Sequence, residues 1–480
     1  MELVQNFIGG QYISSDSKNF IDIYEPATGE IYGQLKDSNA NDINLAVRSA
    51  KTAFPVWSSL TVKERSVYLN NIADGIETRL DEFAEFESRD TGKPIALARS
   101  LDIPRSVVNF KFFAEYANNF EFKFYLNSKT SQNYINRFPL GVVACISPWN
   151  LPLYLFTWKI APALISGNTV IAKPSEFTPY TAFILGDVCK EAGLPPGVLN
   201  IVNGKGSTCG DLLVKHKDIK AISFTGGTST GKVIFENSSN SLKKLSLEMG
   251  GKNPAIIFGD CDYESMLDNI VRSSFSNQGQ ICLCSSRLLI ENTIYEKFKN
   301  DFSLKVSELL IGDPSKDETQ FGSIASESHF QKVVSYIELV KKEGGKIILG
   351  GQKVELEGRC SNGWFIEPTI VEGLDPLSKV NQEEIFGPVV TLQSFKTEAD
   401  VIEVANNTDY GLSATIWTDD IEKGERVAKQ VDAGVIWINC WLLRDLRTPF
   451  GGMKNSGLGR EGGDDAIKFF TEQKNICMPV

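Results

Sequence analysis

One cysteine stands where a nucleophile could act. Residues 275–282 read Phe-Ser-Asn-Gln-Gly-Gln-Ile-Cys, and the residues before them carry apolar side chains at helical spacing. Cys282 therefore lies just past the expected end of a helix. A nucleophilic thiol needs a partner that manages protons. Neither of the two histidines, His216 and His329, lies in a recognisable catalytic context. A carboxylate is the natural substitute, and Glu248 in Leu-Glu-Met-Gly-Gly-Lys is the candidate.

Composition excludes several classes of function. The chain has 480 residues, enough for two or more domains, and a net charge of −11 without a dense basic run. Nucleic-acid binding is therefore disfavoured. The nine scattered cysteines and an N-terminus without a signal peptide favour reduced thiols in a cytoplasmic protein. Cys282 and Cys284 have no second cysteine or histidine pair nearby, so we expect no metal site.

One uncharged stretch, residues 138–158, resembles a membrane span. It contains Pro139, Pro148 and Pro152, which disrupt a continuous helix in lipid. A buried strand followed by an active-site loop explains the stretch better, and no membrane partner is expected.

The middle of the chain alternates short apolar runs with helical patterns. The runs cover residues 142–146, 169–172, 199–202, 221–224, 244–247 and 254–258. Alternation of this kind predicts a parallel sheet with helices on both faces. Ligands of such sheets bind at the carboxyl ends of the strands. The turns at 148–150, 173–176 and 225–227 should therefore carry chemistry.

The flanking regions have different patterns. Residues 1–120 predict a covering segment of strands and long helices, with amphipathic spacing over 47–54 and 68–83. Residues 260–450 repeat the strand and helix alternation, which suggests a second α/β domain. The polar stretch 127–137 predicts an exposed ribbon, and the apolar tail 475–480 could pack. Surfaces of this kind favour a homo-oligomer, as a homodimer or homotetramer.

Three turns could hold a dinucleotide. Thr225, Gly226 and Gly227 form a turn at an expected helix N-terminus, whose free amides can bind a pyrophosphate. The glycine spacing there resembles a phosphate loop, but Val233 replaces the required serine or threonine. The alternative is a tight turn without a ligand.

Charged residues near two other turns suit ribose hydroxyls. Lys173 and Glu176 follow a strand and can together donate to and accept from a diol. A surface ion pair is the alternative. Glu384 offers a second carboxylate beside Phe386, whose ring could flank a base. In isolation, this second pair would be read as a capped loop.

Seven motifs in order resemble those of the aldehyde dehydrogenase superfamily over essentially the whole chain. They lie at residues 149–150, 173–176, 226, 248–251, 279–282, 384–386 and 449–452. The resemblance implies an α/β fold with a doubly wound parallel-sheet NAD-binding domain (1–120 and 140–250). It also implies an α/β catalytic domain (251–450) and a small β-ribbon oligomerisation element (121–139 and 466–480). Ser147 and Trp149 are implied as further cofactor contacts.

The resemblance also implies a mechanism. The Cys282 thiolate adds to an aldehyde, the Asn150 amide and the Cys282 N–H bind the oxyanion, and hydride passes to NAD. Glu248 then activates the water that hydrolyses the thioester. NAD is favoured over NADP because Glu176 would repel a 2′-phosphate. Gly227 departs from the serine of many relatives, which removes one hydroxyl contact to the pyrophosphate.

Two arginines narrow the substrate. Arg105 and Arg444 come from separate segments and suit a carboxylate by bidentate pairing. Both segments resemble those of 2-aminomuconic 6-semialdehyde and 2-hydroxymuconic semialdehyde dehydrogenases, which implies a small carboxylated aldehyde as substrate. The alternatives are structural ion pairs with Asp102 or Asp445, a retinal or general aldehyde dehydrogenase, and a non-enzymatic relative. Such relatives usually lose the cysteine or the glutamate.

Overall fold

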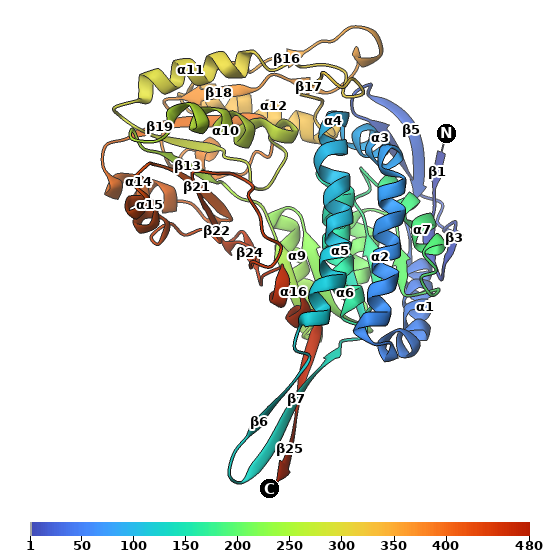
Figure 1. The fold of residues 1–480 in the computed structure, drawn as a ribbon. Helices are drawn as coiled ribbons and strands as arrows, with labels where there is room; N and C mark the ends of the chain where they lie inside the picture. Colours follow the sequence, from blue (N-terminus) through green and yellow to red (C-terminus); the bar gives the residue numbers. More distant parts are fainter. Residues whose placement is uncertain (1) are drawn as a thin grey trace.

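The computed structural model describes residues 2–480, and its largest element is an eight-stranded sheet (Figure 1). In spatial order its strands are Gly457–Leu458 (β24), Lys244–Glu248 (β12), Ile219–Thr225 (β11), Val142–Ile146 (β8), Thr169–Lys173 (β9), Leu199–Ile201 (β10), Asn6–Ile8 (β2) and Gln11–Ile13 (β3). The five central strands are parallel. The chain first adds β9 and β10 on one side of β8 and then adds β11 and β12 on the other side. The sheet is therefore doubly wound, and its switch point lies between β8 and β11. The predicted fold class is confirmed.

Helices cover both faces of this sheet, and the apolar residues of its central strands are buried beneath them. All five residues of β8 and of β9 are buried, as expected when helices cover both sides. One face packs on Ala40–Ser59 (α1), Asp211–Lys215 (α8) and Thr228–Ser238 (α9). The other packs on Pro152–Ile165 (α6) and Tyr180–Glu191 (α7), with Val62–Thr78 (α2), Leu80–Thr91 (α3) and Ile103–Asn119 (α5) outside them (Figure 1).

A second, seven-stranded sheet follows. Its spatial order is Lys346–Leu349 (β15), Thr369–Glu372 (β18), Val389–Phe395 (β19), Arg287–Glu291 (β14), Pro254–Ile257 (β13), Ser413–Trp417 (β21) and Val435–Ile438 (β22). All neighbours are parallel except β15 and β18. Its helices are Tyr263–Phe275 (α10), Tyr295–Ser307 (α11), Glu327–Lys342 (α12), Lys379–Gln382 (α13), Glu398–Asn406 (α14) and Ile421–Ala428 (α15).

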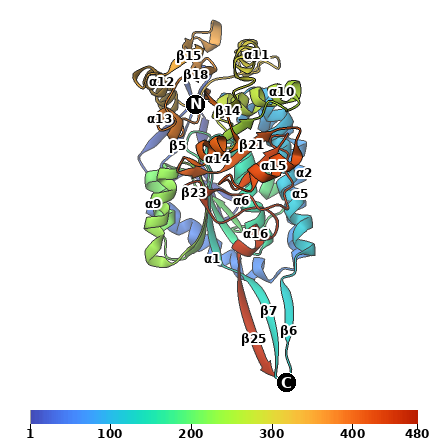
Figure 2. The same cartoon turned by 90° about the vertical axis from the view of Figure 1, so that its left-hand side faces the viewer.

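Three antiparallel strands form a ribbon that projects from the body of the molecule (Figures 1 and 2). They are Lys123–Asn127 (β6), Ser131–Pro139 (β7) and Thr471–Pro479 (β25), with β7 in the middle. The expected exposed ribbon is present, and the tail joins it as a strand. Residues 466–470 instead bury Ala466, Ile467 and Phe470 in the core of the first sheet, so the ribbon strand begins at Thr471. The division into domains remains a prediction.

The helices of the N-terminal region have different bounds from the amphipathic patterns, and α1 extends beyond residues 47–54 on both sides. The pattern over residues 68–83 spans two helices, because the chain breaks at Arg79 between α2 and α3. Within residues 2–480, no helix has both the length and the apolar character needed to cross a membrane. The uncharged stretch 138–158 forms β8, a loop and the start of α6.

The remaining elements are short. They are the strands Glu2–Val4 (β1), Phe20–Glu25 (β4), Glu30–Lys36 (β5), Lys353–Val354 (β16), Phe365–Ile366 (β17), Tyr410–Gly411 (β20) and Met453–Lys454 (β23), with the helix Gly463–Phe469 (α16) and the turn Ile95–Leu97 (α4). Short 3-10 or π segments cover Ala98–Asp102 (η1), Gly206–Gly210 (η2), Ser239–Ser241 (η3), Ser276–Gly279 (η4) and Gly358–Cys360 (η5).

Candidate active site

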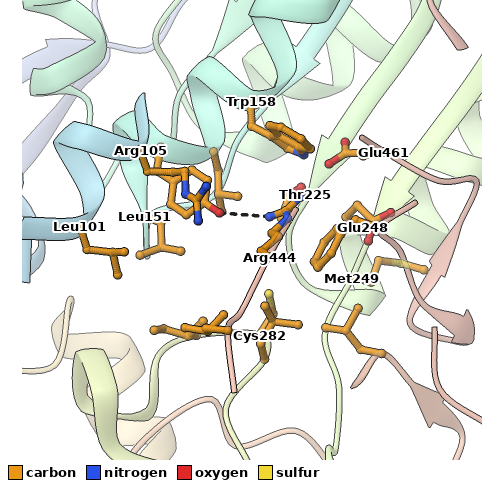
Figure 3. Close-up of a pocket in the computed structure, with 17 residues that line it drawn as sticks. Leu101, Arg105, Leu151, Trp158, Thr225, Glu248, Met249, Cys282, Arg444 and Glu461 are labelled. Atoms are coloured by element: carbon orange, nitrogen blue, oxygen red, sulfur yellow. Dashed lines mark hydrogen bonds between the residues drawn. The ribbon is translucent and has the colours of Figure 1, made fainter. Parts of the chain in front are cut away.

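Two cavities meet at Cys282. One is lined by Arg105, Arg444 and Glu248, and the other by Asn150, Trp149, Thr225, Glu384 and Phe386. Both lie near the switch point between β8 and β11, where ligands of doubly wound sheets bind. Figure 3 shows the Cys282 sulfur pointing into the cavity that Arg444 and Glu248 also line. The structure therefore brings the predicted nucleophile, base and substrate arginines together.

A left-handed turn presents Cys282. Helix α10 ends at Phe275, and the chain then passes through Asn277 (φ 51°), Gln278 (φ 55°) and Gly279 (φ 70°). Positive φ is unfavourable for residues other than glycine and persists only where the surroundings enforce it. Here the buried Gln278 Nε2 donates to the Gly92 and Ser323 carbonyls, both at 3.0 Å. Side-chain hydrogen bonds thus hold the turn that positions the thiol.

Cys282 is protonated at neutral pH in this environment. Burial, together with the nearby Glu384 and Glu248 carboxylates, raises the pKa of its thiol to about 12. Arg444 acts in the opposite direction. Cys284, the alternative thiol, lines neither of the two cavities and is buried with its Sγ 3.8 Å from the Ser276 carbonyl oxygen. The geometry therefore favours Cys282 over Cys284 as the nucleophile.

Glu248 ends β12 with a carboxylate that is free to act. Within residues 2–480 neither of its buried oxygens has a hydrogen-bond partner. Burial raises the pKa of Glu248 well above its ordinary value, and the neighbouring Glu461 raises it further. Glu461 itself accepts a hydrogen bond of 2.7 Å from Lys159 Nζ. Burial and a like charge both favour the protonated form of a carboxyl group.

Asn150 is held by its own backbone and side chain. Its carbonyl oxygen accepts from Lys93 Nζ and from Asn277 Nδ2, both at 3.0 Å. Its side-chain Nδ2 donates to the Gln280 carbonyl at 2.8 Å. An amide nitrogen carries two hydrogens, so the second N–H remains for another acceptor beside Cys282.

Aromatic rings and a carboxylate line the second cavity. The Trp149 ring lies 5.3 Å from the Phe386 ring and 4.9 Å from the His329 ring. His329 Nε2 donates to the Phe386 carbonyl at 2.7 Å, and burial lowers the pKa of His329 to about 4. His329 thus lines the second cavity, a position that the sequence did not predict. Its isolated position in the sequence gave no signal, because the fold brings α12 to the cavity.

The Glu384 carboxylate occupies a space that is open only because residue 250 is glycine. Its Oε1 accepts from the Gly251 amide at 2.9 Å, and a Cβ at Gly250 would lie 2.0 Å from its Oε2. Burial raises the pKa of Glu384. The sequence Gly-Gly after Met249 therefore makes room for a carboxylate that lines the cavity.

A third cavity lies along α9, and Glu176 lines it with Gly206. Lys173 Nζ lies 3.2 Å from Glu176, whose other oxygen accepts from the Gly206 amide at 3.2 Å. Burial alone would raise the pKa of Glu176, but Lys173 and the backbone donors hold it below its ordinary value. The two residues are thus paired and partly buried, not a fully exposed surface pair.

Gly226 and Gly227 line the second cavity, and Ser147 is not among its lining residues. The Gly226 amide is not free, since it donates to the Glu248 carbonyl at 3.0 Å as the pairing of β11 with β12 continues. Gly227 is the N-cap of α9 and lines the second cavity, as does Thr225. Ser147 lies buried after β8 and lines none of these three cavities.

The two arginines lack carboxylate partners. Arg444 donates from Nη1 to the Tyr154 hydroxyl at 3.0 Å and lies over the Trp158 and Phe450 rings. Arg105 lies over the ring of Tyr154, with its guanidinium carbon 5.8 Å from the ring centre. Within residues 2–480 neither arginine forms an ion pair; Asp102 pairs with Lys93, and Asp445 pairs with Arg447. The two suggested structural ion pairs are therefore absent from this part of the chain.

Comparison with known proteins matches this site to one family. The model of the aldehyde dehydrogenase family matches residues 12–476. The chain is 49% identical to the 2-aminomuconic semialdehyde dehydrogenase of Danio rerio (99% of this chain, 98% of the relative). It is 42% identical to the 2-hydroxymuconic semialdehyde dehydrogenase of Pseudomonas sp. strain CF600 (100% of both).

Solved structures agree. PnpE from Pseudomonas sp. WBC-3 superposes with a TM-score of 0.97 at 38% identity, covering 100% of this chain and 98% of that one. PnpE has also been solved in complex with nicotinamide adenine dinucleotide, again with a TM-score of 0.97 at 38% identity (99% of this chain, 97% of that one). With a matching family model, these relatives and the site geometry, the chain belongs to the aldehyde dehydrogenase family.

Proposed function

We propose that this protein oxidises a carboxylated semialdehyde with NAD, through a covalent intermediate on Cys282. The observation that carries the proposal is the pair of arginines in the cavity of the thiol. Arg105 and Arg444 have no carboxylate partner within residues 2–480. A partly buried cation on the approach to the thiol is costly unless an anion accompanies it. A substrate carboxylate supplies that anion and fixes the orientation of the aldehyde at the other end.

The second and third cavities fit a dinucleotide. Glu384, which lies against Gly250, suits the hydroxyls of one ribose. The Gly227 turn at the start of α9 suits a pyrophosphate. Glu176 suits the other ribose, and its ionised carboxylate disfavours a 2′-phosphate. Trp149 and Phe386 flank the space beside Cys282. When bound, NAD would accept the hydride from the substrate carbon.

The residues of the chain account for the remaining chemistry. The Cys282 thiol must lose its proton before it adds to the aldehyde, and Glu248, unpartnered and in the same cavity, can take that proton. The free Asn150 N–H and the Cys282 backbone N–H would then stabilise the oxyanion of the thiohemiacetal. After oxidation to the thioester, and once Glu248 has passed the thiol proton to solvent, its carboxylate would activate a water that releases the acid and regenerates Cys282.

The specific substrate we propose is 2-aminomuconate 6-semialdehyde, oxidised to 2-aminomuconate. The 49% identity to a relative of that name supports it, as does the arginine pair. The 42% identity to a 2-hydroxymuconic semialdehyde dehydrogenase supports the hydroxy analogue as a second candidate. Retinal and general aldehydes carry no anion of this kind for the two arginines.

The experiment is a direct assay of NADH formation. The panel contains both muconic semialdehydes, retinal and an uncharged aliphatic aldehyde of similar length. A preference in kcat/KM for the muconic substrates supports the proposal, and a preference for an uncharged aldehyde refutes it. Cys282→Ser should abolish turnover on every substrate while leaving NAD binding intact, since serine is a much weaker nucleophile.

Assembly as a homodimer or homotetramer is a further part of this proposal. The ribbon exposes Tyr125 (62%), Leu126 (57%) and Met478 (44%), and its outer strands β6 and β25 offer free edges. Free strand edges of this kind can pair with a strand of another chain. Sedimentation of the purified protein measures the assembly directly.

A further inference from the structure

A buried ammonium lies directly behind the candidate oxyanion site. Lys93 follows α3 and is 0% exposed. Its Nζ donates to Asp102 and to the backbone carbonyl of Asn150, and it lies 3.7 Å from Glu87. A lysine is almost never fully buried unless it is paired. The partners of the Lys93 ammonium are therefore groups inside the protein.

The Asn150 carbonyl is fixed from two sides. Lys93 donates to it from one side, and Asn277, in the left-handed turn before Cys282, donates from the other. A hydrogen bond from a charged donor is stronger than one from a neutral amide. Because a side chain moves with its own backbone, the charged bond also sets where the Asn150 amide points.

The turn that contains Lys93 also contacts the segment before Cys282. Gly92, next to Lys93, accepts from Gln278 Nε2 at 3.0 Å. A Cβ at Gly92 would lie 2.0 Å from Ser323 Oγ, so the turn packs closely against Ser323. The oxyanion donor and the thiol thus share one anchor, the turn of Thr91, Gly92 and Lys93.

The surrounding carboxylates hold the Lys93 ammonium in place. Glu87 and Asp102 are both fully buried, and each has one oxygen without a hydrogen-bond partner within residues 2–480. Burial raises the pKa of Glu87 to about 7, while Lys93 opposes this shift. Glu87 Oε2 also accepts from the Leu153 amide at 3.3 Å, near the start of α6. The cluster therefore contacts the chain both at Asn150 and in the first turn of α6.

We propose that Lys93 is a positioning residue for catalysis, whose ammonium bonds the Asn150 carbonyl and thereby aims the Asn150 amide at the oxyanion. The inference rests on the proposed function, in which Asn150 stabilises the intermediate on Cys282. Lys93 touches neither of the two cavities at Cys282. Its effect must therefore pass through Asn150, and that dependence is measurable.

The test is a double-mutant cycle between Lys93→Met and Asn150→Ala, with kcat measured on an uncharged aldehyde. Methionine has a similar length and volume but carries no charge. In the wild-type background Lys93→Met should lower kcat roughly tenfold or more, within the ~10²–10³-fold range that loss of an oxyanion donor costs. In the Asn150→Ala background the same change should lower kcat less than about twofold, since coupled residues are not additive. KM for NAD should be unchanged.

Two further variants keep the test decisive. Arg65→Met removes a buried cation that donates to the backbone carbonyls of Leu60 and Ile165, the latter at the end of α6 opposite to the Asn150 loop. It should lower the melting temperature without lowering kcat, and so controls for the loss of a buried charge. If Lys93→Met does not fold, Asp102→Asn carries the same cycle, because it weakens the hold on the ammonium at unchanged volume.

The outcomes separate the inference from the proposed function. If Lys93→Met (or Asp102→Asn) lowers kcat by equal factors in both backgrounds, or leaves kcat unchanged, the positioning role is refuted. If Cys282→Ser and Asn150→Ala both retain normal turnover, the proposed function fails instead, whatever the Lys93 variant does. A loss confined to the wild-type background supports both.

Discussion

Arg444→Met would remove the guanidinium that lies between Tyr154 and the mouth of the thiol cavity. In the structure this group makes one hydrogen bond of 3.0 Å to the Tyr154 hydroxyl and stacks on Trp158 and Phe450 at 4.5 and 4.2 Å. Methionine keeps much of the stem and loses the charge. If the charge binds a substrate carboxylate, the variant is impaired on charged substrates alone.

The size of the effect follows from the exposure of the side chain. Loss of one partner of a buried charge pair costs about 2–5 kcal/mol. Arg444 is only half-buried, so water can replace part of the interaction and about 2 kcal/mol is expected. Since about 1.4 kcal/mol corresponds to a tenfold change, kcat/KM on a carboxylated semialdehyde should fall roughly 30-fold. The lost ring contacts, about 0.5–2 kcal/mol each, should lower the melting temperature modestly.

The assay compares two substrates and two variants. NADH formation is followed with 2-hydroxymuconic semialdehyde and with an uncharged aldehyde of similar length. Arg447→Met is the matched control, because Arg447 lies in the same loop but pairs with Asp445 at the surface; it should leave kcat/KM on both substrates unchanged. Equal losses of Arg444→Met on both substrates would refute a carboxylate-binding role and return Arg444 to a structural one.

The remaining predictions concern ionisation in the site. Because the pKa of Cys282 is about 12, alkylation of this thiol by iodoacetamide should accelerate up to at least about pH 9 without a plateau; a plateau near neutral pH would contradict the burial argument. Glu248→Ala should stall at the thioester, which mass spectrometry would detect as an acyl adduct on Cys282; normal turnover would assign the water to another base. His329 is neutral in the fold, with its pKa lowered from 6.5 to about 4. The stability this contributes is present above pH 6.5 and is lost as pH falls toward 4, because the unfolded chain takes up the proton first. His329→Gln should therefore lose less melting temperature than the wild type between about pH 7 and about pH 5; an equal loss would contradict this.

The sequence carried enough information for the sheet and for the reacting groups. Apolar runs such as β8 and β9 are buried on both faces, so their composition alone marks them as central parallel strands. Cys282 and Glu248 were found because a nucleophile and its base need particular residue types. Arg105 and Arg444 were predicted to bind a substrate carboxylate because a cation near the thiol is costly without an anion.

Other parts of the site left no trace in the sequence. Lys93 and His329 reach the site through long-range packing, and their neighbours in the chain resemble an ordinary turn and a helix start. The Gly226 amide was expected to be free, but strand pairing with β12 takes it up, and pairing partners are not readable from one strand. The division of the amphipathic pattern at Arg79 likewise depends on tertiary packing.

The position of the thiol at the junction of two cavities has a consequence for inhibitor design. A small electrophile with an anionic group could enter past the arginines and reach Cys282 without displacing a molecule in the other cavity. Such a compound would compete with the aldehyde and leave cofactor affinity unchanged. A compound that links both cavities across the sulfur would gain affinity from each, because the second contact becomes intramolecular once the first has formed.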